Sequence, residues 1–249
     1  ASNVGILLTG SLKLLKTGAG DFLPTKTGHA YSGGTEIAGG LFKAWEVYYP
    51  NGYGITVDTG ATYDVDGANQ EGCHAMITGG LVLNGGTVVN QTSDVSWGSI
   101  PYIRLLADST LRSVYSWNIL GNAYSATSLE LGGNTFTIDV ASGKSFTVYN
   151  CTITSGTLKL TGAGQLIFTN RSKCESRFNN VSIDLGSSIN LGSAVTVQDL
   201  TVNYTGKATD GAQRLYVEGV YTPNTDYIHN FTLRNGSTID LRKKTAAWP

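Results

Sequence analysis

Charged side chains are scarce in this chain. Asp, Glu, Lys and Arg make up 14% of its 249 residues, against about 25% in an average soluble protein. Lys and Arg total 17 and Asp and Glu total 18, so the net charge is −1. Because gripping a phosphate backbone needs a basic face, this balance argues against a nucleic-acid partner. The apolar runs, such as Val4 to Leu8, are far shorter than the ~20 residues that cross a bilayer, so the chain is not expected to span a membrane.

Cysteine and proline are also rare, whereas glycine is abundant. Five prolines and 32 glycines suit short strands joined by tight turns. The three cysteines, Cys73, Cys151 and Cys174, show no metal-ligand spacing. No metal and no cofactor are therefore predicted.

A short unit recurs in the C-terminal half. Residues 180–192 read NVSIDLGSSINLG and residues 230–242 read NFTLRNGSTIDLR. Residues 150–160, NCTITSGTLKL, form a third copy, and residues 199–202 repeat the opening alone. A constant unit at irregular intervals is typical of a parallel β-helix whose turns carry loops of different length. The sequence therefore predicts an all-β chain, a right-handed parallel β-helix (solenoid), with residues 1–249 in a single elongated domain.

The residue that opens each unit has a structural interpretation. Equivalent residues of successive turns lie about 4.8 Å apart, so side-chain amides at one bend can form a hydrogen-bonded ladder. We predict such a ladder at Asn150, Asn180, Asp199 and Asn230. Residues 127–249 are accordingly expected to form regular Asn-ladder coils, and residues 45–126 irregular coils with aromatic-rich loops.

Seven Asn-x-Ser/Thr triplets occur, at Asn90, Asn150, Asn170, Asn180, Asn203, Asn230 and Asn235. Because three of them are ladder positions, we interpret the triplets as structural rather than as glycosylation sites.

Cys151 and Cys174 lie about one predicted turn apart. Two interpretations follow: a disulfide between stacked turns, or two small buried side chains. The second is preferred because unpaired cysteine is so often buried.

Residues 11–44 read SLKLLKTGAGDFLPTKTGHAYSGGTEIAGGLFKA, short apolar runs bounded by glycine that predict strands. The stretch resembles the passenger-associated repeat of bacterial autotransporters, whose pattern runs L-x-K-x-G-x-G-x-L and then x-Y-x-G-x-T-x-I-x-x-G-x-L. The matching positions are Leu15, Lys16, Gly18, Gly20, Tyr31, Gly33, Gly34, Thr35, Ile37, Gly40 and Leu41. The chain departs from that pattern at residues 21–24, where a proline is expected to interrupt the hydrogen bonding of a strand.

The resemblance implies a secreted or surface-displayed β-helical passenger segment at the bacterial cell surface. Such an adhesin presents loops to host-surface glycans or proteins and is not an enzyme. The membrane β-barrel of that family has no counterpart in these residues, so an excised piece or a differently exported variant is expected. Uncapped ends of a solenoid would also favour end-to-end self-association.

Aromatic side chains are concentrated in the middle of the chain. Trp97, Tyr102, Tyr115 and Trp117 are the candidate ligand-binding residues, because aromatic rings offer large contact areas to sugars or peptides. The alternative hypothesis is that they fill an irregular core.

A carbohydrate-active β-helix enzyme, a polysaccharide lyase or glycoside hydrolase, is the alternative function, and a trimeric viral fibre is a further one. Glycoside hydrolysis needs two carboxyl groups about the scissile bond. Asp58, Asp64 and Asp66 are the closest acidic cluster, but no adjacent Asp pair occurs, and His29, His74 and His229 have no acid at a suggestive spacing. Residues 64–71 look like a calcium loop but lack an oxygen ligand at Ala68, where an EF-hand has one. No catalytic residue is predicted.

Overall fold

The fold is described from a computed structural model of the chain. It describes the backbone at residues 2–4, 7–24, 30–43, 54–65, 75–77, 79–120, 127–149, 151–169, 176–185, 188–191, 195–204, 214–218, 228–229, 232–234 and 238–242. Side chains are described at residues 7–24, 30–43, 54–65, 77, 79–95, 100–119, 127–149 and 151–167.

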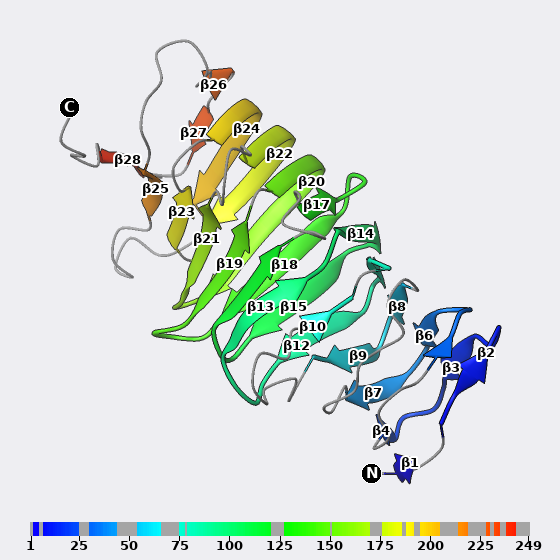
Figure 1. Cartoon of the computed structure of the whole chain (residues 1–249). Coiled ribbons are helices and arrows are strands. Elements are labelled where there is room, and N and C mark those ends of the chain that lie inside the picture. The colour runs from blue at the N-terminus through cyan, green and yellow to red at the C-terminus, as the bar shows by residue number, and fades with distance from the viewer. Residues whose placement is uncertain are drawn as a thin grey trace, which may run out of the picture.

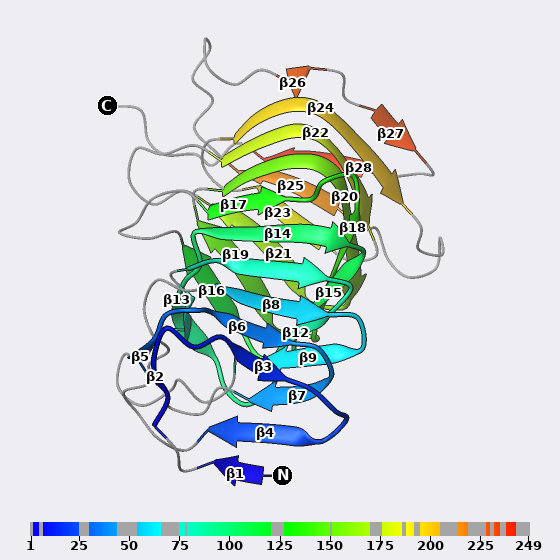
Figure 2. The ribbon, with the colours of Figure 1, turned by 90° about the vertical axis from the view of Figure 1, so that its right-hand side faces the viewer.

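The described strands wind as a stack of turns, and each strand pairs in parallel with the equivalent strands of neighbouring turns (Figure 1). Five successive turns begin at β8, β11, β14, β17 and β20, and further turns lie on either side of them (Figure 2). No helix occurs among the described residues. The predicted all-β parallel solenoid is therefore confirmed.

Each complete turn has three faces. Face one consists of β3 (Leu14–Lys16), β6 (Thr35–Ile37), β8 (Ile55–Asp58), β11 (Leu81–Asn84), β14 (Tyr102–Ala107), β17 (Thr127–Glu130) and β26 (Ile228–His229). Face two consists of β1 (Ser2–Val4), β4 (Asp21–Pro24), β7 (Gly40–Lys43), β9 (Ala61–Asp64), β12 (Thr87–Asn90), β15 (Ser109–Ser113), β18 (Thr135–Val140) and β27 (Thr232–Arg234). Three longer strands run across both of these faces: β20 (Cys151–Gly162), β22 (Ser176–Leu185) and β24 (Val195–Tyr204).

Face three closes the turn. Its strands are β10 (Ala75–Met76), β13 (Val95–Ser99), β16 (Trp117–Leu120), β19 (Ser145–Tyr149), β21 (Gln165–Thr169), β23 (Ser188–Leu191), β25 (Arg214–Glu218) and β28 (Thr238–Arg242). In the first two turns a small separate sheet of β2 (Thr9–Gly10) and β5 (Ala30–Tyr31) precedes face one.

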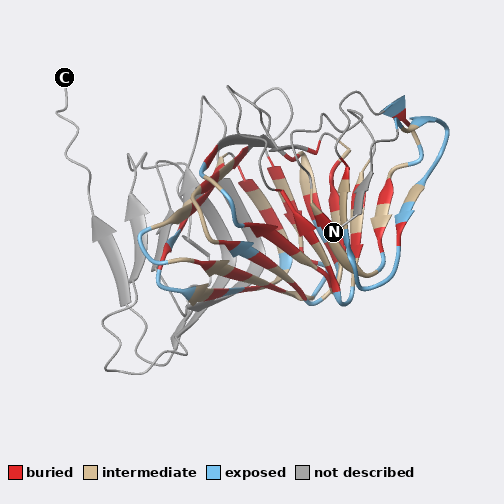
Figure 3. Ribbon diagram, turned by 90° about the horizontal axis from the view of Figure 1, so that it is seen from below, coloured by how far each residue is buried: buried red, intermediate tan, exposed pale blue. Residues whose placement is uncertain are grey.

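The core consists of apolar side chains stacked in columns. Alternate residues of a strand point to opposite sides of a sheet, and parallel in-register pairing places each inward side chain on its equivalent in the next turn. On face one the column runs through Ile55, Leu81, Ile103, Leu129 and Ile153, all buried. On face three it runs through Val95, Trp117, Phe146 and Leu166. Buried residues accordingly line the interior of the stack in Figure 3.

The stretch that resembles the autotransporter repeat forms the first two turns, and two glycines of that pattern lie where these turns approach closely. Gly40 has φ +67°, and a Cβ there would lie 2.6 Å from the carbonyl oxygens of Gly18 and Gly20. A Cβ on Gly33 would lie 2.6 Å from the backbone of Leu12. Only glycine allows these neighbouring turns to stack at this separation.

The lysine of that stretch points into the core rather than to solvent. Lys16 pairs with Ile37, which pairs with Val57, so it occupies the first place of an otherwise aliphatic column. Its Nζ donates to the carbonyl oxygens of Thr17 (3.0 Å), Gly18 (2.8 Å) and Gly39 (2.7 Å). All three ammonium hydrogens are therefore used, which is how a charged group can be held at only 9% exposure.

The strand interruption expected at residues 21–24 is seen at the end of β4. The interruption is on one side only: pairing between β4 and β7 covers Asp21 and Phe22 and stops before Pro24, whereas pairing between β4 and β1 continues to Pro24. A proline can stand there because no hydrogen bond to β7 is needed from its nitrogen.

The predicted repeat alignment holds for its later copies and fails for the first. β22 pairs with β24 so that Asn180 lies opposite Asp199, and β24 pairs with β27 as the repeat predicts. In contrast, β20 pairs Thr154 with Asn179 and Gly156 with Val181, which places Ser155 opposite Asn180. The alignment of residues 150–160 with residues 180–192 was thus wrong by five residues. Asn150 and Asn230 themselves lie outside the described residues, as does the side chain of Asn180.

The reason is local backbone geometry. Ser155 has φ +43°, in the left-handed region that a sharp bend requires and that few residues other than glycine and asparagine adopt readily. A serine therefore takes the bend position in this turn, where the repeat comparison expected asparagine.

Candidate functional site

The four candidate ligand-binding aromatic residues do not form one platform. Trp117 is fully buried on face three, and its ring packs against Phe146 with centroids 5.4 Å apart. Its proposed role in an exposed binding surface is therefore wrong, and the alternative of core filling applies. The side chain of Trp97 lies outside the described residues.

Tyr102 is a half-buried residue that holds two turns of face one together. Its hydroxyl donates to the carbonyl oxygen of Gly79 at 2.9 Å. Its ring covers Gly80 so closely that a Cβ there would lie 2.2 Å from the ring. The guanidinium of Arg104 lies 5.4 Å from the ring centroid. Much of the ring is thus already in contact with the protein.

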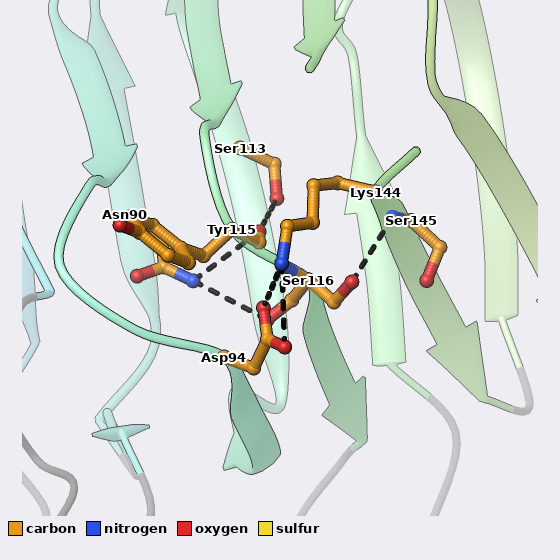
Figure 4. Close-up of polar contacts among 7 residues, drawn as sticks. All are labelled: Asn90, Asp94, Ser113, Tyr115, Ser116, Lys144 and Ser145. Atoms are coloured by element: carbon orange, nitrogen blue, oxygen red, sulfur yellow. Dashed lines mark hydrogen bonds and ion pairs between the residues drawn. The ribbon is translucent and has the colours of Figure 1, made fainter. Parts of the chain in front are cut away.

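Tyr115 lies at the corner between faces two and three, in a cluster of polar side chains (Figure 4). Tyr102, in contrast, stands at the start of face one. Each turn contributes one short connection to the Tyr115 corner, and these connections stack. Asp94 comes from the first of three successive turns, Tyr115 and Ser116 from the second, and Lys144 from the third. We call these four residues the corner cluster.

Lys144 joins the corner cluster across three turns. Its Nζ donates to Asp94 Oδ1 at 3.1 Å and Oδ2 at 3.4 Å, and it lies 5.0 Å from the ring centroid of Tyr115. The backbone N–H of Ser116 also donates to Asp94 Oδ1 at 2.8 Å. Figure 4 shows the Lys144 side chain extended toward the carboxylate of Asp94. The Asp94 side chain nevertheless remains 58% exposed, so the cluster is open to a ligand from solvent.

Hydrogen bonds and a neighbouring amine lower the pKa of Asp94 in the corner cluster. Partial desolvation alone would raise the pKa of Asp94. Hydrogen bonds from Lys144 and from the Ser116 N–H, together with the charge of Lys144, outweigh it and hold the pKa of Asp94 below its ordinary value. The carboxylate of Asp94 is therefore ionised at neutral pH and lies beside the Nζ of Lys144. They can accept and donate hydrogen bonds beside an aromatic ring, a combination suited to hydroxyl-rich ligands.

Beneath the cluster, polar groups fix the corner backbone. Asn90 Nδ2 donates to the carbonyl oxygens of Tyr115 and Ser116, each at 3.4 Å, and Ser113 Oγ donates to that of Tyr115 at 2.5 Å. Asn90 is fully buried, so its Asn-x-Ser/Thr triplet is structural, as predicted.

The two described residues of the acidic cluster, Asp58 and Asp64, make structural contacts. Asp58 accepts a hydrogen bond from Asn84 of the next turn at 3.0 Å. Asp64 is fully buried, accepts one from Gln91 at 2.7 Å and has Lys43 Nζ at 4.0 Å. Asp66 lies outside the described residues, with most of the calcium-like loop and with His29 and His74. Among the described residues no group of His, Cys, Asp and Glu could hold a metal ion.

Other ionic contacts on the outer surface also join neighbouring turns. Lys13 pairs with Glu36, Arg104 with Glu130 and Arg112 with Asp139. The two opposite charges of each pair neutralise one another, in keeping with a net charge near zero.

Cys151 is fully buried, and burial raises the pKa of its thiol well above the ordinary value. It occupies an inward place at the start of β20, opposite Thr127. Cys174 and Cys73 lie outside the described residues, so the disulfide alternative stays untested.

Sequence reasoning missed Asp94 and Lys144. They are 50 residues apart in the sequence. They meet because their connections stack at the same corner, two turns apart. Their positions in the sequence were the one signal that could have found them, because both residues lie in short polar connections directly before a face-three strand.

Comparison of the chain with known proteins finds no matching family, no matching curated protein and no matching solved structure. In the part of the chain that the structure describes, no helix has the length and apolar character to cross a membrane.

Proposed function

We propose that this chain is a secreted or cell-surface β-solenoid segment, of the autotransporter-passenger kind, that serves as a rigid stalk and presents corner loops for adhesion. The observation that carries the proposal is the geometry of its first two turns. Lys16, Gly33 and Gly40, all pattern residues of the passenger-associated repeat, each meet a steric or hydrogen-bonding demand of the stacked turns. The solenoid fold is compatible with such a passenger.

The corner cluster is the proposed adhesive contact. It combines an aromatic ring, a carboxylate and an ammonium on rigid turns, and such preorganised polar and aromatic groups suit recognition of sugar hydroxyls. Host-surface glycans are accordingly the proposed ligands, and the proposed role involves no catalysis.

Binding of the purified chain to a glycan array and to mucin-coated surfaces tests the proposal. Tyr115→Ala should weaken the binding, whereas Tyr102→Ala, at a different corner, should leave it unchanged. Equal binding by both variants would exclude the corner cluster, and no binding to any glycan or cell surface would remove the adhesive role. Release of shortened or unsaturated products from pectin, alginate or mucin glycans would instead support the carbohydrate-active alternative.

A further inference from the structure

The corner cluster places a hydrogen-bond acceptor and a hydrogen-bond donor side by side at the surface. Lys144 Nζ lies 3.1 Å from Asp94 Oδ1 and 3.4 Å from Oδ2, and the Asp94 side chain is 58% exposed. The ring centroid of Tyr115 lies 5.0 Å from the same Nζ. A ligand from solvent meets these three groups together, so their remaining hydrogen bonds and their charges define its chemistry.

Both polar groups keep part of their hydrogen-bonding capacity for a ligand. An ionised carboxylate can accept about four hydrogen bonds. Asp94 accepts two at Oδ1, from Lys144 and from the Ser116 N–H, and a longer one at Oδ2 from Lys144. Its Oδ2 can therefore still accept from a hydroxyl. A lysine side chain has three donors, and the two hydrogen bonds of Lys144 both go to Asp94, which leaves an N–H for a ligand oxygen.

An adjacent acceptor and donor match two hydroxyl groups on neighbouring carbon atoms. One hydroxyl can donate to Asp94 while its neighbour accepts from Lys144, because a hydroxyl acts as donor or as acceptor. The buried side chains of Asn90 and Ser113 hold the carbonyl groups of the corner backbone in place. The two groups are therefore positioned before a ligand arrives, which lowers the entropic cost of binding.

The charges at this corner are balanced in pairs, and this balance selects an uncharged ligand. Asp94 is paired with Lys144. On β15 and β18, the strands that lead into the same corner, Arg112 Nε lies 3.5 Å from Asp139. An anionic sugar would have to displace Asp94 from Lys144 to gain an ion pair, and a cationic one would have to displace Lys144 from Asp94. A neutral ligand binds with the ion pair intact.

We propose that the corner cluster binds an uncharged sugar through two hydroxyl groups on adjacent carbon atoms. Asp94 accepts a hydrogen bond from one hydroxyl, Lys144 donates to the other, and the ring of Tyr115 contacts the apolar part of the sugar. This inference rests on the proposed adhesive function and names its ligand class: neutral glycans, rather than sialylated, sulfated or uronic-acid glycans.

Binding of the purified chain to mucin-coated surfaces and to a glycan array tests the inference. Enzymatic removal of sialic acid should leave the binding in place. Periodate treatment of the desialylated surface should then abolish it, because periodate cleaves the bond between adjacent hydroxyl-bearing carbons. Raising the salt concentration should have little effect, since binding neutralises no net charge.

Asp94→Asn gives a change of specificity that a purely structural role would not produce. The variant loses the charged acceptor, so its affinity for neutral glycans should fall about tenfold. It also leaves Lys144 without its carboxylate partner, so its affinity for sialylated glycans should rise. Glu130→Gln is the matched control, because it removes a carboxylate from the surface ion pair with Arg104 on face one; it should bind like the unaltered chain. Circular dichroism establishes that both variants are folded.

The outcomes separate the ligand class from the adhesive function. Binding that is confined to anionic glycans, or that survives periodate, would overturn the inference and leave the adhesive function standing. Equal losses in Asp94→Asn and Glu130→Gln would also overturn it. A chain that binds no glycan and no cell surface would remove the adhesive function itself, and this inference with it.

Discussion

A matched pair of glycine substitutions separates close turn-on-turn contact from backbone strain. Gly40 and Gly60 both have φ in the left-handed region, at +67° and +77°. A Cβ at Gly40 would lie 2.6 Å from two carbonyl oxygens of the preceding turn, whereas a Cβ at Gly60 would meet nothing within 4 Å. Alanine at either position thus carries the conformational cost, and only alanine at Gly40 must also push two turns apart.

The expected magnitudes follow from these two terms. Gly60→Ala should cost about 1–2 kcal/mol, the penalty for a left-handed non-glycine residue. Gly40→Ala should cost about 2–5 kcal/mol, because overpacking adds about 1–3 kcal/mol. Since a solenoid can unfold turn by turn, hydrogen exchange of the strand amides next to each substitution is the suitable assay of the local opening free energy. The reasoning is refuted if Gly40→Ala costs no more than Gly60→Ala.

Three further substitutions probe the core and the corner cluster. Lys16→Met should destabilise the first turns by about 1.5–3 kcal/mol in urea unfolding, since it removes charge-assisted hydrogen bonds from buried carbonyls; an unchanged midpoint would contradict the contacts of Lys16. Trp117→Ala should cost about 3–5 kcal/mol, measured in the same way, and a cost typical of a surface residue would restore Trp117 as a binding candidate. The lowered pKa of Asp94 stabilises the fold above its unfolded-state pKa, and that stability is lost as pH falls through the folded-state value. Asp94→Asn should therefore reduce the fall in thermal midpoint below about pH 4, and an identical fall would show that the ion pair with Lys144 adds nothing.

Much of the fold could be predicted because the determinants are local and repeated. Short strands bounded by glycine and a unit recurring at residues 180, 199 and 230 indicated stacked turns, and the pairing of β22 with β24 matches that unit residue by residue. The alignment failed at residues 150–160, because a bend can be made by any residue that adopts positive φ. Ser155 makes it there, where asparagine was expected.

The candidate site was harder to predict from the sequence. The residue type alone does not show whether an aromatic side chain points into the core or toward solvent. Strand register decides which of the two it does. Trp117 begins β16 opposite Val95 and so belongs to an inward column, while Tyr115, two residues earlier, is still in the connection. The contact between Lys144 and Asp94 depends on the lengths of two intervening turns, which no local pattern reveals.

Disulfide trapping across neighbouring turns tests the central claim of in-register parallel winding most directly. Thr110 and Thr137 are paired on face two, where neighbouring strands lie about 4.8 Å apart, a separation that a disulfide spans readily. Mild oxidation of the double variant Thr110→Cys, Thr137→Cys should give that cross-link in peptide mapping, whereas Thr110→Cys, Asp139→Cys, displaced by two residues, should not. Efficient cross-linking of the displaced pair, with none between positions 110 and 137, would contradict the winding.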